Sequence, residues 1–339
     1  MSADLTRLVD LVEAFPRQTV AVFGDLVADE FVFGEISRVS REAPVLILRH
    51  RETQFVPGGG ANAANNLADL GARVLPVGVV GKDAAGDALI TYFRRKRVDT
   101  SGILRVPGWT TTTKTRFLAG FAHTARQQVL RMDREPAASL PARVRAALLR
   151  KAQERAKRAG ALLVSDYGCG TVTPAAVRKL RSRRIFLDSR YTMLDYRSAR
   201  ITAATPNEPE LESLFHARIG TDNRALERLG SRALRAMKLE ALLVTRGKDG
   251  MMLLERGRRP HSLPVFGSDQ AVDVTGAGDT VIAVFTLALV AGATFLEAAE
   301  LANYAGGIVV MKRGTATVTR AELLAAIRTD ATSAPGKPE

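Results

Sequence analysis

The stretch DVTGAGDTVIAVFTLALVAGA, residues 273–293, joins a turn of small residues to a long apolar run. The turn contains Gly276, Ala277 and Gly278, and Asp279 follows at the start of the apolar run. A helix that is apolar all round is expected to be buried. Glycines at its start let a ligand approach the unpaired backbone N–H groups of the first turn, where the helix dipole favours anions. The stretch therefore predicts an anion site at the mouth of a core helix.

Asp279 has two interpretations at this position. Its carboxylate can accept a proton from an attacking hydroxyl while the helix N-terminus stabilises charge on a transferring phosphoryl group. Alternatively, Asp279 only caps the helix and the glycines serve close packing. The apolar helix favours the first interpretation, because a buried helix is a rigid mount for a catalytic group.

Outward from this stretch, short apolar runs rich in β-branched residues alternate with amphipathic helical stretches. The runs that we expect to be buried parallel strands are 19–25, 73–81, 160–168, 184–189, 200–207 and 241–247. The helices expected between most of them include 61–70, 84–97, 141–159, 223–238 and 318–328. This alternation predicts a doubly wound α/β fold, a mostly parallel sheet flanked by helices. Ligands in such sheets gather at the carboxyl ends of the strands, where these runs end in Gly, Asp, Asn or Ser.

Two stretches, 31–56 and 111–135, break the alternation, because they have the pattern of strands joined by turns with no helix between them. We interpret them as a small β-strand lid on a single domain that covers residues 1–328. Residues 329–339 are polar and contain proline, so we expect a disordered tail there.

The composition is that of an ordinary globular protein, with 46% hydrophobic and 25% charged residues among 339. The single cysteine, Cys169, excludes a disulfide framework within the chain and fits a reducing, cytoplasmic location. The N-terminal residues lack the continuous apolar core of a signal peptide. The longest apolar run, 281–293, is shorter than the roughly 20 residues of a membrane span. We therefore expect no contact with a membrane.

The net charge of +14 is compatible either with nucleic acid or with anionic small molecules as partners. Many arginines lie in helical stretches such as 143–160, interleaved with alanine and leucine, which is typical of a solvated helix face. The sequence contains no nucleic-acid recognition motif and no aromatic-rich basic cluster. We therefore expect no nucleic-acid partner.

A second glycine turn, in VPGGGANAANNLADLG (56–71), also leads into a helix. Asn62, Asn65 and Asn66 follow it closely, and asparagine can both donate to and accept from sugar hydroxyls. The consecutive glycines do not have the G-x-G-x-x-G spacing of a dinucleotide site, which disfavours a nicotinamide enzyme. The alternative is a helix start with packing glycines.

Carboxylates follow two of the expected strands. Asp25 ends the first strand and is placed to grip hydroxyls, with Asp29 in a secondary role. In TPNEPELESL (205–214), Asn207 and Glu210 can hold hydrated Mg²⁺ near phosphates or can simply cap a helix, and these residues alone favour the cap. A P-loop and the protein-kinase H-R-D and D-F-G motifs are absent from the sequence.

Taken together in this order, the motifs resemble the ribokinase/PfkB family of carbohydrate kinases. PGGGANAANNLADLG is similar to the N-terminal glycine signature of that family, and DVTGAGDTVIAVF is similar to its C-terminal signature. The resemblance covers about residues 15–325. Within the family, the segments that look most like the kinase domain of the heptose-7-phosphate kinase/adenylyltransferase enzyme are 24–48, 111–120, 126–135 and 307–323.

The resemblance implies a role for each motif, with ATP and Mg²⁺ as cosubstrate and metal. The residues implied to act on the transferred phosphate are Asp279 as catalytic base and Gly276, Ala277 and Gly278 as anion hole. The residues implied to hold the sugar are Asp25, Gly59 and Asn62. Asn207 and Glu210 match the N-x-x-E motif, which acts on Mg²⁺ and phosphate. The residues implied to border ATP are Asn207, Thr245, Gly247, Gly250 and, near the adenine, Asn303.

Three cations of the expected lid, Lys114, Arg116 and Arg131, are our own candidates for gripping a phosphate carried by the sugar. Cations at the lid would complete an anionic pocket, and arginine in particular binds phosphate with two parallel hydrogen bonds. The lid of relatives often pairs with a second subunit, so the resemblance also implies a homodimer.

Two positions depart from the pattern of heptose kinases. Cys169 stands in DYGCG where they typically have lysine, and Arg190 stands in DSR where they tend to have D-P-K. Both positions fall near the active-site edge of the sheet. The two changes are compatible with a kinase, but they leave open whether the acceptor is a heptose. No H-x-G-H motif of an adenylyltransferase is present, and we expect a stand-alone kinase.

We therefore expect a sugar kinase that transfers the γ-phosphate of ATP to D-glycero-D-manno-heptose 7-phosphate and forms the 1,7-bisphosphate. The first alternative is a PfkB-type kinase for another sugar, sugar phosphate or nucleoside. The second is a non-catalytic sugar or nucleotide sensor on the same fold, which would not need to keep the base. The third is a nucleic-acid-binding protein that uses the net positive charge.

Overall fold

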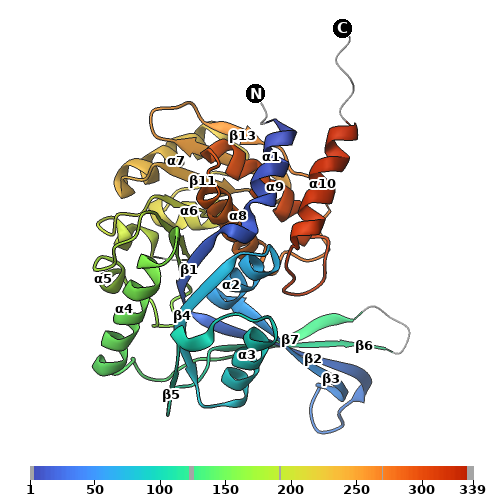
Figure 1. The fold of residues 1–339 in the computed structure, drawn as a ribbon. Coiled ribbons are helices and arrows are strands. Elements are labelled where there is room, and N and C mark those ends of the chain that lie inside the picture. Colours follow the sequence, from blue (N-terminus) through green and yellow to red (C-terminus); the bar gives the residue numbers. More distant parts are fainter. Residues whose placement is uncertain (1–3, 122–125, 191, 269, 334–339) are drawn as a thin grey trace.

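The computed structural model describes residues 4–121, 126–190, 192–268 and 270–333, with side chains as far as residue 330 (Figure 1). In this part of the chain the main sheet has nine strands, in the order β13-β12-β11-β10-β9-β8-β1-β4-β5. Their bounds are β1 Thr19–Gly24, β4 Arg73–Gly81, β5 Ile103–Val106, β8 Ala161–Asp166, β9 Ile185–Ser189, β10 Ala203–Ala204, β11 Ala241–Thr245, β12 Met251–Glu255 and β13 His261–Leu263.

Neighbouring strands from β5 to β11 are parallel, and β12 and β13 are antiparallel additions at one edge. The expected α/β fold with a mostly parallel sheet is confirmed. The expectation of a strand over 200–207 was wrong in length, because β10 keeps only two residues. Arg200 has a φ of 55°, outside the extended region, and Pro206 has no N–H for the sheet ladder.

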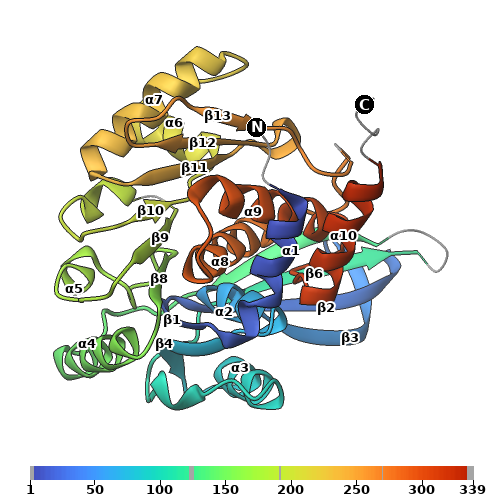
Figure 2. The ribbon, with the colours of Figure 1, turned by 45° about the horizontal axis from the view of Figure 1, so that its top comes forward.

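Helices cover both faces of the main sheet. Their bounds are α1 Leu5–Glu13, α2 Gly60–Asp69, α3 Ala84–Arg95, α4 Ala142–Lys157, α5 Pro174–Val177, α6 Glu208–Phe215, α7 Asn223–Met237, α8 Ala277–Val290, α9 Phe295–Val309 and α10 Arg320–Ser333. Figure 2 shows α4 and α5 on one side of the sheet and α1, α8, α9 and α10 on the other. None of the described helices is long and apolar enough to cross a membrane.

The two-sided burial follows from the alternation of side chains along each strand. In β1, Val20 and Val22 belong to the core beneath α1, α2, α8 and α9, whereas Ala21 and Phe23 belong to the core beneath α4 and α7. All four side chains are apolar and at most 1% exposed. A strand buried on both faces is therefore a continuous apolar run, as expected from the sequence.

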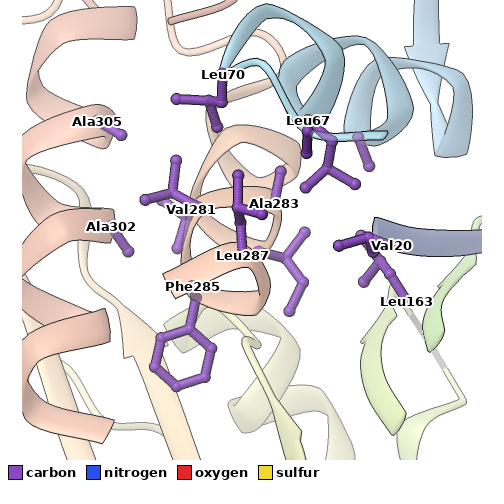
Figure 3. Packing of buried hydrophobic residues seen from close by; sticks show 14 of the residues in the cluster. Val20, Leu67, Leu70, Leu163, Val281, Ala283, Phe285, Leu287, Ala302 and Ala305 are labelled. Carbon is purple, nitrogen blue, oxygen red and sulfur yellow. The ribbon is translucent and has the colours of Figure 1, made fainter. Parts of the chain in front are cut away.

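Helix α8 is the element that the opening stretch predicted to be buried. Every residue from 279 to 289 is buried in it. Figure 3 shows Val281, Ala283 and Leu287 among side chains that come from α2, α9 and the main sheet. Full burial of a Val, Leu or Phe side chain contributes about 1.5–3 kcal/mol, so α8 is held firmly from all sides. Its N-terminus is consequently a rigid point of the fold.

A second sheet, which we call the small sheet, has the strand order β3-β2-β6-β7 and projects from the main body (Figure 1). Its strands are β2 Leu26–Val39, β3 Leu46–Gly59, β6 Thr113–Gly120 and β7 Gln127–Arg134. Asp25 alone separates β2 from β1, and β3 runs directly into α2. The stretches 31–56 and 111–135 thus form strands without helices, although residues 122–125 lie outside the described part.

The C-terminal helix α10 continues to Ser333, past the boundary at residue 328 where we expected a disordered tail to begin. Residues 329 and 330 are therefore helical, and Tyr304 of α9 donates its hydroxyl to Asp330 Oδ2 at 2.5 Å. Residues 334–339 of the expected tail lie outside the described residues.

Candidate active site

The two glycine turns meet at the carboxyl edge of the main sheet, each at the start of a helix. Gly276 caps α8 with a φ of 80°, and as a glycine it has no side chain to bond to the first turn of the helix. A Cβ added to Gly278 would have no atom within 4 Å, so this residue faces open space. Gly59 caps α2 with a φ of 54°, and a Cβ there would lie 3.2 Å from Tyr167 Cδ2. The open space at Gly278 therefore leaves room for a ligand at the first turn of α8, where the N–H of Ala277 already donates to the carbonyl of Val274 at 3.2 Å.

Two cavities meet at this helix N-terminus. One, of about 520 Å³, lies beside α9, and we call it the α9 cavity. The other, of about 400 Å³, lies under the small sheet, and we call it the small-sheet cavity. The residues that line both are Asn207, Thr245, Val274 and Gly278. Ala277 lines the α9 cavity, whereas Gly276 and Asp279 line the small-sheet cavity. The start of α8 thus stands between two spaces of the size of small-molecule sites.

The carboxylate of Asp279 is 3% exposed and accepts a hydrogen bond on each oxygen. The Tyr167 hydroxyl donates to Oδ1 at 2.6 Å, and Asn62 Nδ2 donates to Oδ2 at 2.9 Å. Burial raises the pKa of Asp279 to about 7, and the two hydrogen bonds partly oppose that rise. A carboxylate with a pKa near neutrality is suited to take a proton from a hydroxyl and to release it again.

Asn62, an expected sugar-binding residue, points at Asp279 instead of lining either cavity. Asn66 Nδ2 donates to Asn62 Oδ1 at 3.2 Å, and Thr280 Oγ1 donates to Asn66 Oδ1 at 3.0 Å. This buried chain of polar groups joins α2 to α8 and orients the Asn62 amide toward Asp279. Direct contact between Asn62 and a sugar stays a prediction, whereas Gly59 does line the small-sheet cavity.

Asp25, the second expected sugar-binding residue, is fully buried and lines neither cavity. Its carboxylate accepts the backbone N–H groups of Tyr167, Cys169 and Thr171 at 2.8, 3.0 and 3.0 Å. Burial raises the pKa of Asp25, while these backbone hydrogen bonds oppose the rise. Asp25 therefore fixes the loop after β8, and its direct contact with a sugar stays a prediction.

The three cations chosen from the sequence all line the small-sheet cavity, and Arg190 joins them. Lys114 has a pKa lowered first by burial and further by the neighbouring charges of Arg190 and Arg131. Arg131 forms an ion pair with Asp133 at 2.5 Å, and Arg116 forms one with Asp29 at 2.6 Å. Positive groups close enough to depress the pKa of a lysine favour an anion in this cavity.

Asn207 and Glu210 form a capping box at the start of α6. Asn207 Oδ1 accepts the N–H of Glu210 at 2.8 Å, and Glu210 Oε2 accepts the N–H of Asn207 at 3.0 Å. The cap that the residues alone favoured is therefore present, and the role on Mg²⁺ stays a prediction. Burial raises the pKa of Glu210, and that of Asp188, which lines the same cavity, is raised well above its usual range for the same reason.

These carboxylates fit Mg²⁺ only in a shared site. Among the described residues, no group of three or more His, Cys, Asp or Glu side chains is placed to hold a metal ion alone. Mg²⁺ typically uses one or two protein carboxylates together with phosphate oxygens and water. Glu210 and Asp188 beside the N-terminus of α8 match that donor set.

The residues expected to border ATP, namely Asn207, Thr245, Gly247, Gly250 and Asn303, all line the α9 cavity. A Cβ added to Gly247 would have no atom within 4 Å, so the turn after β11 is open to the cavity. Asn303 Nδ2 donates to the carbonyl of Pro264 at 2.7 Å and holds the opposite wall. Apolar side chains such as Met251 and Val281 complete the lining of this cavity.

Tyr167 and Asp188 line the small-sheet cavity but received no role from sequence reasoning, and Arg190 was noted there only as a departure. Tyr167 directly follows β8, and Asp188 and Arg190 lie at the end of β9. Their position at the carboxyl ends of strands was the available signal. That signal does not say which side chain turns into the cavity.

Comparison with known proteins agrees with this geometry. Residues 17–322 match the family described as pfkB family carbohydrate kinase. The protein named "Bifunctional protein HldE" of Desulfatibacillum aliphaticivorans is 39% identical over 324 residues, which are 94% of this chain and 64% of that protein. The protein of the same name from Geobacter metallireducens is 40% identical over 312 residues, 89% of this chain and 61% of that protein. The chain thus spans less than two thirds of the length of these relatives.

Solved structures show the same fold. Arabidopsis thaliana ribokinase, complexed with ribose and ATP, has a TM-score of 0.70 at 21% identity and covers 92% of this chain and 98% of its own. Phosphofructokinase-2 from Escherichia coli, in complex with potassium, has a TM-score of 0.74 at 17% identity and covers 93% and 99%. The ribokinase-like fold and the resemblance seen in the motifs are confirmed. The chain belongs to the pfkB family of carbohydrate kinases.

Proposed function

We propose that the protein is an ATP- and Mg²⁺-dependent sugar kinase whose acceptor is a phosphorylated sugar. The observation that carries the proposal is the N-terminus of α8 between two cavities, with Asp279 on the small-sheet side. The acceptor favoured by the motifs is D-glycero-D-manno-heptose 7-phosphate, and the product would be the 1,7-bisphosphate.

In the proposed reaction, ATP lies in the α9 cavity against Thr245, Gly247, Gly250 and Asn303. Asp279 takes the proton of the acceptor hydroxyl as its oxygen bonds to the γ-phosphorus. The bond from the γ-phosphorus to the bridging oxygen breaks, ADP leaves with that oxygen, and Asp279 later releases the proton to water. The N-terminus of α8, with Gly276, Ala277 and Gly278 around it, stabilises the transferring phosphoryl group.

Mg²⁺, when bound, would neutralise charge on the phosphates, with Asn207, Glu210 and Asp188 as the residues that would hold it. Most of the acceleration would come from positioning and electrostatics, since phosphoryl transfer requires little covalent chemistry from the protein. The small sheet acts in this proposal as a lid that excludes water from the transfer.

The preference for a phosphorylated acceptor rests on the cations of the small-sheet cavity. Lys114, Arg131 and Arg190 line it together, and their mutual repulsion is relieved when an anion binds among them. Arg116 already pairs with Asp29 and Arg131 with Asp133, so we give these two arginines the smaller part. A neutral acceptor such as ribose would leave these charges without a substrate partner.

An ADP-release assay with Mg-ATP tests the proposal. The panel contains heptose 7-phosphate, fructose 6-phosphate, fructose, ribose and adenosine, with a control that lacks sugar. Strong turnover of heptose 7-phosphate alone would support the named acceptor and make Cys169 and Arg190 neutral substitutions. Turnover of a different sugar would discard the heptose acceptor and keep the kinase. Binding of ATP and sugar without turnover would favour the sensor instead.

We also propose that two copies of the chain associate through the small sheet. Apolar side chains are unusually exposed there, with Val39 58%, Val45 55% and Leu130 57% accessible. A cavity of about 1070 Å³ beneath the outer half of the sheet, lined in part by Phe31 and Phe33, offers space for the second copy. Light scattering should give twice the chain mass, and Leu130→Asp should reduce it to one chain.

A further inference from the structure

The catalytic carboxylate is held by a tyrosine that also lines the substrate cavity. The Tyr167 hydroxyl donates to Asp279 Oδ1 at 2.6 Å. Asn62 Nδ2, from helix α2, donates to Oδ2 at 2.9 Å. Two donors on opposite oxygens determine the plane of a carboxylate, because each bond restricts rotation about the side-chain torsion. We propose that Tyr167 is a positioning residue for the base: its hydroxyl orients the Asp279 carboxylate for the acceptor hydroxyl.

The position of Tyr167 is itself well defined. Its backbone N–H donates to Asp25 Oδ2 at 2.8 Å, and Asp25 also accepts the N–H groups of Cys169 and Thr171 in the same loop. On the other side the Tyr167 ring lies close to Gly59, where an added Cβ would come within 3.2 Å of Cδ2. Asp25 and Gly59, both expected to hold the sugar, thus also hold the residue that orients the base.

The surroundings keep the Tyr167 hydroxyl protonated and able to donate. Burial raises the pKa of Tyr167 well above its usual value, and the negative charges of Asp279 and Asp188 raise it further. Lys114 Nζ lies 5.3 Å from the centre of the ring, and such a cation over a tyrosine polarises the hydroxyl toward donation. Tyr167 therefore connects the phosphate-binding side of the cavity to the base.

The charged groups that line the same cavity as Asp279 are Asp29 of β2, Lys114 and Arg116 of β6, Arg131 of β7, Asp188 of β9, Arg190 directly after β9, and Glu210 of α6. The three carboxylates disfavour an ionised Asp279, and Lys114 favours it. The Tyr167 hydroxyl also favours the ionised form, because its hydrogen bond is strongest to a carboxylate. Removing that hydroxyl should therefore reduce both the orientation and the ionised fraction of the base.

This inference rests on the proposed kinase function, and Tyr167→Phe tests it with the sugar that the wild type uses. At pH 7 we expect kcat to fall about 10- to 100-fold, the size of a misplaced general base, while KM for sugar and for ATP changes less than about threefold. The acid limb of the kcat profile should move to higher pH, so that part of the loss is recovered at pH 9. Unchanged kcat, or a rise in KM alone, would overturn the positioning role.

Tyr196→Phe is the matched control. Its hydroxyl donates to the Asp166 carboxylate at 2.7 Å and is fully buried, but it does not touch Asp279. This variant should lose stability without the loss of kcat and without the shifted acid limb. An equal kinetic effect in both variants would mean that deleting any buried hydroxyl disturbs the site, which overturns the specific role of Tyr167.

A measurement that needs no sugar separates this inference from the proposed function. With ¹³C-carboxyl-labelled aspartate, the resonance of Asp279 is the one lost in Asp279→Asn. Its titration midpoint should lie higher in Tyr167→Phe than in the wild type, and equal midpoints would overturn the inference. If the wild type turns over no sugar but the titration midpoint of Asp279 still lies higher in Tyr167→Phe, only the proposed kinase activity is contradicted.

Discussion

The hydroxyl of Tyr167 and the carboxylate of Asp279 lie 2.6 Å apart, although 112 residues separate them in the chain. One follows β8 in the main sheet, and the other begins the buried helix α8. Their contact places the Asp279 carboxylate at the point where the loop after β8 meets the N-terminus of α8. The following predictions test what that arrangement does.

Asp279→Asn should fold normally, bind ATP and lose about 10²- to 10⁴-fold in turnover, because the variant cannot accept the proton of the acceptor hydroxyl. Circular dichroism and ATP calorimetry check the fold and the nucleotide site, and ADP release checks turnover. Activity close to that of the wild type would remove Asp279 from the role of base.

Turnover should depend on pH through Asp279. Burial raises its pKa to about 7, so the carboxyl group is protonated and inactive below that pH and ionised above it. We therefore expect kcat to fall about tenfold per pH unit at pH values below about 6 and to level off above about 8. The measurement is a kcat profile from pH 5 to 9 at saturating substrates. A flat profile down to pH 5 would contradict an essential buried base.

The same group should lower the stability of the fold at high pH. A carboxyl whose pKa is higher in the folded than in the unfolded chain costs no stability below about pH 4, and its cost grows until the pH passes the folded pKa. The free energy of unfolding of Asp279→Asn should thus exceed that of the wild type by about 1–4 kcal/mol at pH 8, with little gain at pH 4. The variant should therefore unfold at a higher temperature than the wild type at pH 8. Thermal unfolding at both values checks this, and a gain independent of pH would point to another cause.

Lys114→Ala should raise KM for a phosphosugar more than for the same sugar without its phosphate. The lysine lines the small-sheet cavity, and a charge-assisted contact to a substrate phosphate contributes about 1.5–3 kcal/mol, or roughly 10- to 150-fold in KM. Arg134→Ala is the control, because Arg134 lies in the same sheet but pairs with Glu30 at 2.7 Å outside this cavity. Equal effects on both sugars would exclude Lys114 from phosphate recognition.

Sequence reasoning succeeded where the information is local. The apolar runs of β1 and β4 and the wholly apolar α8 follow from side-chain periodicity, so they were found close to their observed bounds. The glycine turn before Asp279 was recognised as the start of α8, because glycine adopts the positive φ that Gly276 has there. The strand expected over 200–207 has only two residues, because Arg200 has a positive φ and Pro206 has no N–H for the sheet ladder.

The sequence alone determined the layers of the fold, the buried helix with its glycine turn, the strands of the small sheet and the family. Only the tertiary structure decided that Asp25 holds the loop of Tyr167, that Asn62 and Tyr167 hold Asp279, and that Arg190 shares a cavity with Lys114. The periodicity of apolar residues in a helix or strand involves only residues a few positions apart in the chain. The direction of a side chain beyond the end of a strand is set instead by packing between segments more than one hundred residues apart.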